Sequence, residues 1–146
     1  MTHPLTILLP LKGRHLHTLR FLFHADRAGL PYHFLIADGE VHPAIARVLE
    51  NPLSAFPNLD IEYIRYPNDA RYSDFYRKMA DASARVRTPY VLQADNDDFL
   101  VASGIERCLK FLDARPDYVG CGGGVGGFEL NAAREKKLEF VVGTLQ

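Results

Sequence analysis

Short apolar runs recur along the chain and alternate with stretches of helical periodicity. Each run has four or five residues and is bounded by proline, glycine or polar side chains, which is the pattern of a buried strand. The runs predict strands at residues 6–9, 33–37, 61–64, 90–94 and 118–121. The last sixteen residues, 131–146, contain a charged piece with a helical pattern and then a final apolar run at residues 140–142.

Amphipathic patterns between the runs predict helices. In the first pattern, four apolar side chains are expected on one helix face: Leu16, Leu19, Leu22 and Phe23. In residues 72–86 the corresponding face carries Phe75, Met79, Ala82 and Val86. Shorter helical patterns begin at Pro43 and near Ile105. Strands that alternate with helices predict an α/β fold, with a mostly parallel sheet in a three-layer, Rossmann-like α/β/α arrangement, as a single domain over residues 1–146.

Composition narrows the classes of function. The 146 residues are 47% apolar and 24% charged, and the formal net charge is -1, so no global field favours nucleic acid or an anionic membrane. No apolar run approaches the roughly 20 residues that span a bilayer, and the first residues lack the pattern of a secretory signal. The two cysteines make neither a disulfide framework nor a zinc motif. We therefore expect a cytoplasmic location, or a peripheral one at the inner membrane face reached through partners.

The largest cluster of candidate functional side chains follows the fourth apolar run. Asp95, Asp97 and Asp98 come directly after it, and in extended backbone Asp95 and Asp97 would point to the same side. Clustered carboxylates repel one another unless a cation lies nearby, and Mg²⁺ is commonly held by one or two carboxylates plus substrate phosphates. The alternative interpretation is a solvated acidic turn that caps the next helix.

Two further strand ends carry polar residues. The first run leads into residues 10–14, which include Lys12 and Arg14, and the second ends at Asp38 and Gly39. Parallel sheets bind ligands at the carboxyl ends of their strands. Convergence of three such ends favours a binding site over a solvated turn. His24, His33 and His42 are isolated in the sequence, and structural or surface roles are expected for them.

Three pieces of the chain, in order, resemble the family-2 glycosyltransferases of the GT-A fold. Residues 7–14, ILLPLKGR, resemble the opening pattern IIP-T-x-N-R of that family. Residues 35–39, LIADG, resemble VVDDGS, and residues 88–99, TPYVLQADNDDF, resemble GEYI-x-x-LDADD. The resemblance covers about residues 5–127, which correspond to the nucleotide-binding part of the family.

The resemblance implies a site for a nucleotide-diphosphate sugar, a UDP-sugar first among the donors. Pro10 would lie against the base and Asp38 would bond to it, while Asp95 would contact the ribose or the metal. Asp97 would bind Mn²⁺ or Mg²⁺ at the diphosphate, with Asp98 as the alternative ligand. The candidate phosphate partners are Lys12, Arg14, Arg71 and Lys78. The sugar would pass to an unidentified acceptor, a saccharide or a lipid.

The chain also departs from the family pattern. Leu11 stands where the family has Thr, and Gly39 stands where it has a second Asp. No residue is identified as the catalytic base, so a non-catalytic nucleotide-binding remnant or fragment is an open alternative. A nucleotidyltransferase is another, although Lys12-Gly13-Arg14 is a short match to its G-x-G-x-R loop, and a signalling receiver domain ranks last. An exposed sheet edge in a short chain also predicts a homodimer.

Overall fold

The computed structural model describes residues 3–40, 42–130 and 138–141. The chain divides into two compact units, Met1–Ala102 and Ser103–Gln146. The single domain expected over residues 1–146 stays a prediction. Among the described residues, no helix combines the length and the apolar character needed to span a bilayer.

A four-stranded, all-parallel sheet forms the centre of the first unit. Its strands are β1 (Leu5–Leu11), β2 (His33–Asp38), β3 (Asp60–Arg65) and β4 (Tyr90–Gln93), in the order β3-β2-β1-β4. The two inner strands read as almost continuous apolar runs and are almost entirely buried, as expected for a sheet covered on both faces. The outer strands β3 and β4 have more exposed side chains.

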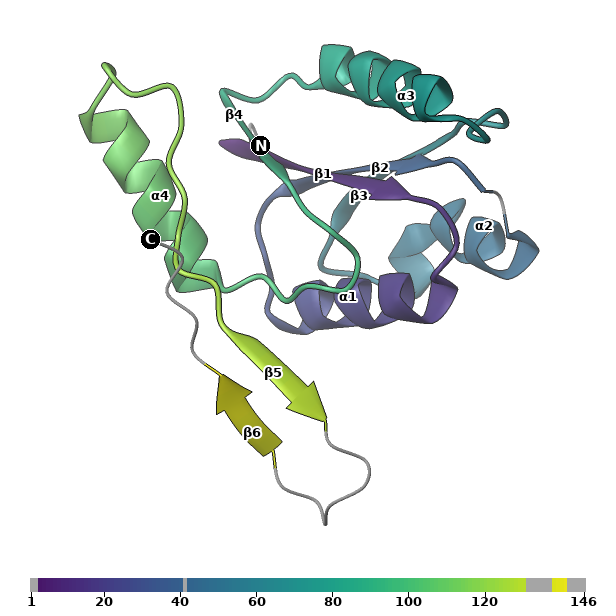
Figure 1. The fold of residues 1–146 in the computed structure, drawn as a ribbon, viewed down its shortest axis with the longest axis horizontal. Helices are drawn as coiled ribbons and strands as arrows, with labels where there is room; N and C mark the ends of the chain where they lie inside the picture. The colour runs from purple at the N-terminus through teal and green to yellow at the C-terminus, as the bar shows by residue number, and fades with distance from the viewer. Residues whose placement is uncertain (1–2, 41, 131–137, 142–146) are drawn as a thin grey trace. The chain divides into compact units, whose positions relative to one another are not determined.

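Helices cover both faces of this sheet (Figure 1). α1 (His15–Arg27) and α2 (Pro43–Leu49) lie on one face, and α3 (Tyr72–Arg85) lies on the other. A short 3₁₀ helix, η1 (Pro52–Ser54), follows α2. This arrangement confirms the predicted three-layer α/β fold. The predicted apolar face of α3 is also confirmed in part, because Ala82, Met79 and Val86 pack on Leu8 and Leu35 of the inner strands.

The predicted face of α1 is wrong in part. Leu22 is buried as predicted, but Leu16 and Phe23 are 80% and 50% exposed. The side chains that α1 buries against the sheet are Thr18, Phe21, Leu22 and Ala25. Positions 18, 21, 22 and 25 have the i, i+3, i+4, i+7 spacing of a helix stripe, so the periodicity was present but the phase was set by contact with the sheet.

The fifth predicted strand, at residues 118–121, is also wrong. Residues 118–126 form no helix or strand, and Val119 is fully exposed. Glycines fill much of this segment, and a glycine offers no side chain to pack while losing more backbone entropy than other residues. The second unit instead contains α4 (Ala102–Ala114), which begins at the boundary, and an antiparallel pair, β5 (Gly127–Leu130) and β6 (Leu138–Val141).

The second unit bears on two smaller expectations. Most of the charged helical pattern near the end of the chain, residues 131–137, lies outside the described residues. The apolar run that follows contributes to β6. Cys108 and Cys121 are both free thiols, in agreement with the absence of a disulfide framework.

Candidate functional site

The carboxyl ends of β1, β2 and β3 surround a pocket of about 760 Å³ beside the start of α3. Its charged lining residues are Lys12, Glu40, Asp69, Arg71, Asp74 and Arg77. Two of the predicted phosphate partners, Lys12 and Arg71, are therefore brought to one cavity. Sequence patterns did not indicate Glu40, Asp69 or Asp74, which lie in loops and at a helix start where no strand pattern marks them.

Two basic side chains of the pocket have different surroundings. Arg71 is exposed just before α3, and its backbone N–H donates to Asp74 Oδ2 at 3.0 Å. Arg77 Nη1 lies 3.8 Å from Asp74 Oδ1, so that guanidinium is loosely paired. Asp74 thus anchors the first turn of α3 near its positive N-terminal end. The anchored turn leaves the Arg71 guanidinium at the pocket.

Asp38 lies at the last position of β2 and is 2% exposed. Its Oδ1 accepts from the backbone N–H of Glu40 at 3.0 Å, and its Oδ2 accepts from the Tyr63 hydroxyl at 2.6 Å. Burial, together with the hydrogen bond to Asp38 and its negative charge, raises the pKa of Tyr63. The carboxylate therefore holds the turn after β2, and its predicted bond to a base stays a prediction. Pro10 is half-buried within β1 and pairs in register with Ala37.

Lys78 does not lie open to the pocket. Its side chain is 1% exposed, and its ammonium forms an ion pair with Asp69 and donates to the backbone carbonyl of Leu11 at 3.0 Å. The Phe75 ring centroid is 5.3 Å from Lys78 Nζ. Lys12 donates to the backbone carbonyl of Asp69. A phosphate contact by Lys78 would require this buried pair to open. In the structure, Lys78 instead holds Asp69, which lines the pocket.

Gly39 leaves the space that Asp69 occupies. A Cβ placed on Gly39 would lie 2.6 Å from Asp69 Cβ and Cγ, closer than real Cβ atoms approach other atoms. Glycine at position 39 is therefore a steric requirement of this chain.

The acidic residues after β4 form a turn. The backbone N–H of Asp98 donates to the carbonyl of Asp95 at 3.3 Å, so the extended backbone assumed for this stretch is wrong. Asn96 anchors the turn because its buried side chain donates to Thr18 Oγ1 at 3.0 Å. This bond holds the turn against α1, and the Asp95 and Asp97 side chains of the turn are exposed.

Arg14 faces this acidic turn from the start of α1. Its Nη1 lies 2.5 Å from Asp97 Oδ2, and its backbone has the left-handed angles φ 52° and ψ 43°. Asp97 is thus paired with the basic residue that the sequence assigned to phosphate. Burial raises the pKa of Asp98, and the charges of Asp97 and Asp95 raise it further. Asp97 and Asp95 are therefore close enough to Asp98 to disfavour its negative charge.

The turn offers hard oxygen donors of the kind that Mg²⁺ and Mn²⁺ accept. The described residues contain no group of three or more His, Cys, Asp or Glu side chains arranged to hold a metal ion. One or two carboxylates suffice where substrate phosphates complete the coordination. The donor set of Asp95, Asp97 and Asp98 fits that kind of site, in which a cation would also relieve the repulsion at Asp98.

The raised pKa of Asp98 predicts a pH-dependent effect on stability. Its repulsion is absent below the unfolded pKa, and stability is lost as pH rises through the folded value, where the carboxyl ionises. Without metal, Asp98→Asn should raise the free energy of unfolding at pH 7 by less than about 1 kcal/mol, because exposed charges are screened. Urea unfolding at pH 3 and pH 7 checks this. An equal gain at both pH values would contradict the charge explanation.

Comparison with known proteins supplies no family name for the chain. No family model matches it, and a search of curated proteins finds no match. The case for a function therefore rests on the three sequence pieces and on the geometry of the strand ends.

Proposed function

We propose that the chain binds a nucleotide-diphosphate sugar together with Mn²⁺ or Mg²⁺ and transfers the sugar to a hydroxyl group of an acceptor. One observation carries the proposal: a pocket that has Lys12 and Arg71 in its lining and a turn with three carboxylates both follow carboxyl ends of the same parallel sheet. A diphosphate needs cationic partners, and a divalent cation needs carboxylates, so the pair suits a metal-bound nucleotide. The motif resemblance to family-2 glycosyltransferases supports the same assignment.

The residues have distinct roles in this proposal. Arg71 and Lys12, which line the pocket, bind the phosphates or the nucleoside. The Lys78–Asp69 ion pair holds the Asp69 part of the pocket lining in place. Asp95 and Asp97 would hold the cation, with Asp98 as the alternative ligand. When bound, the cation supplies Lewis-acid stabilisation of the leaving diphosphate. Arg14 would then exchange its contact with Asp97 for one with a phosphate oxygen.

The remaining parts of the proposal concern the context of the reaction. The donor is a UDP-sugar, and the acceptor is a saccharide or a lipid. The proposed location is cytoplasmic, with peripheral association at the inner face of a membrane through partners. The active form is proposed to be a homodimer.

Asp97→Ala tests the metal site. Calorimetric titration of UDP and of GDP, with and without Mn²⁺, should give metal-dependent binding to the wild type for one nucleotide. The variant should lose at least about tenfold in that binding, because a charge-assisted contact contributes about 1.5–3 kcal/mol. Asp117→Ala, which removes another exposed carboxylate paired with an arginine, is the matched control and should bind as the wild type does. Failure of every nucleotide to bind folded wild-type protein would reject the proposal.

Arg71→Gln tests the pocket separately from the metal. The substitution keeps a polar side chain but removes the charge, so binding should weaken several-fold whether or not Mn²⁺ is present. Asp97→Ala should weaken only the metal-dependent part. If Arg71→Gln had no effect in either titration, the pocket would not be the nucleotide site. Slow hydrolysis of the UDP-sugar by wild-type protein would further distinguish an enzyme from a non-catalytic remnant.

A further inference from the structure

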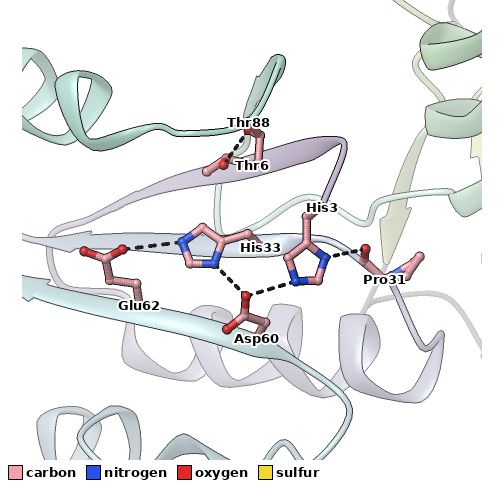
Figure 2. Close-up of polar contacts among 7 residues, drawn as sticks. All are labelled: His3, Thr6, Pro31, His33, Asp60, Glu62 and Thr88. Atoms are coloured by element: carbon pink, nitrogen blue, oxygen red, sulfur yellow. Dashed lines mark hydrogen bonds and ion pairs between the residues drawn. The ribbon is translucent and has the colours of Figure 1, made fainter. Parts of the chain in front are cut away.

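A second polar cluster lies at the opposite, amino-terminal edge of the sheet (Figure 2). It joins His3, which precedes β1, to His33 at the start of β2 and to Asp60 and Glu62 of β3. His33 and Asp60 are partners in the parallel register of β2 and β3. The two imidazole rings are stacked, with centroids 6.3 Å apart. Three segments that are distant in sequence are therefore connected through two histidines.

Each nitrogen of the two rings faces an oxygen that can only accept. His3 Nδ1 is 3.0 Å from the carbonyl of Pro31, and His3 Nε2 is 3.1 Å from Asp60 Oδ2. His33 Nδ1 is 2.8 Å from the same Asp60 oxygen, and His33 Nε2 is 3.5 Å from Glu62 Oε2. Asp60 and Glu62 are two positions apart on one strand, so their side chains lie on the same side of it.

The protonation state of the rings decides whether these contacts attract. A neutral imidazole has one N–H and one lone pair, whereas an imidazolium has two N–H donors. With both rings protonated, every ring nitrogen donates, and two positive charges balance the two carboxylates. With both rings neutral, one nitrogen of each ring turns a lone pair toward an oxygen, and the two carboxylates are left without cations within the cluster.

We propose that this cluster is a proton-operated clasp that fastens the segment before β1 to the amino-terminal ends of β2 and β3. Histidine side chains ordinarily change charge between pH 5 and pH 8. The clasp is closed at pH 5, where the rings are cationic. It loosens as pH rises toward 8, so its contribution to stability is present in the acidic range and lost at the alkaline end.

Other charged groups near the clasp come from α3. The pKa of Arg85 is raised first by its hydrogen bond to Asp81, and the charge of Glu62 raises it further. Arg85 Nε donates to Asp81 Oδ2 at 2.9 Å, and Asp81 also accepts from the Tyr66 hydroxyl at 2.6 Å. Arg85 stays cationic between pH 5 and pH 8, so it shifts the field at Glu62 by a constant amount. Arg85 therefore adds no pH dependence to the clasp over this range.

Thermal unfolding at pH 5 and at pH 8 tests the clasp. Asp60→Asn keeps an acceptor at the centre of the cluster but removes its charge. The wild-type midpoint should exceed that of Asp60→Asn by roughly 2–6 °C more at pH 5 than at pH 8, because partly exposed ion pairs contribute modestly. His17→Gln removes an exposed histidine of α1 and should leave the pH dependence of the wild type unchanged. The same difference at both pH values for Asp60→Asn would overturn the proposal.

A measurement on the wild type alone keeps the test independent of how the variants fold. Nitrogen-15 spectra of the imidazole rings distinguish a ring with two N–H groups from a ring with one. At pH 5 both rings should give two N–H signals with slowed solvent exchange, and these signals should be reduced at pH 8. Rapid exchange of all four ring protons at pH 5 would mean that the rings are solvated and no clasp forms.

Discussion

Lys78→Met should destabilise the protein by about 3–5 kcal/mol, because it leaves the Asp69 carboxylate buried without a cation. The loss is large beside the 5–15 kcal/mol that typically separates folded from unfolded domains. Both partners of the pair are about 1–2% exposed, so water cannot replace the missing ammonium. The Leu11 carbonyl also loses a donor. Urea unfolding at pH 7 measures the change.

Two further variants separate the buried charge from the loss of side-chain bulk. Arg85→Met is the matched control, since it breaks an exposed ion pair on the same helix with the same replacement and should cost much less. The double variant Lys78→Met with Asp69→Leu removes both charges and should recover part of the lost stability, because an apolar pair avoids the cost of an unpaired buried charge. A Lys78→Met loss no greater than that of Arg85→Met would mean that Asp69 finds another partner or water.

The Lys78–Asp69 pair also shows a kind of contact that sequence patterns do not predict. The inner strands were predicted correctly because a strand buried on both faces must be apolar at nearly every position, whatever surrounds it. Asp69 lies in the loop before α3 and pairs with Lys78 of that helix. Lys78 also donates to the carbonyl of Leu11, which is 67 residues earlier in the chain. Position 78 falls on the predicted apolar face of α3, three residues after Phe75 and four before Ala82. Nothing in the sequence indicates Asp69 and Leu11 as its partners, so its charge suggested a phosphate contact.

The predictions for the acidic turn and for the buried face of α1 were wrong for related reasons. The sequence shows two carboxylates, Asp95 and Asp97, on either side of Asn96. It does not show that Asn96 is anchored to Thr18, because Thr18 belongs to a helix that is far away in the sequence. That contact turns the backbone and determines how the carboxylates lie. Likewise, contact with the sheet selects the stripe of α1 that is buried, and the exposed Leu16 breaks the apolar rule without any local signal.

Gly39→Ala should cost about 3 kcal/mol or more, because the added methyl group would overlap a side chain that cannot move away. Asp69 lies within 2.6 Å of the new atom and is held by Lys78 in a buried ion pair. Overpacking alone typically costs about 1–3 kcal/mol, and displacement of the carboxylate would add part of the cost of breaking a buried pair. Gly120→Ala is the matched control, since no atom lies within 4 Å of its added Cβ. Urea unfolding of both variants gives the comparison.

The same substitution in the double variant Lys78→Met with Asp69→Gly tests whether the clash is the cause. Asp69→Gly removes Cβ, Cγ and the carboxylate oxygens, which are the atoms that the added methyl group would overlap, so Gly39→Ala should then cost less than about 1 kcal/mol. If the cost stayed the same in that background, the backbone at Gly39 would be the constraint. A cost that disappears would mean that Gly39, Asp69 and Lys78 are energetically coupled. Glycine at position 39 would then be a requirement of the buried Lys78–Asp69 ion pair.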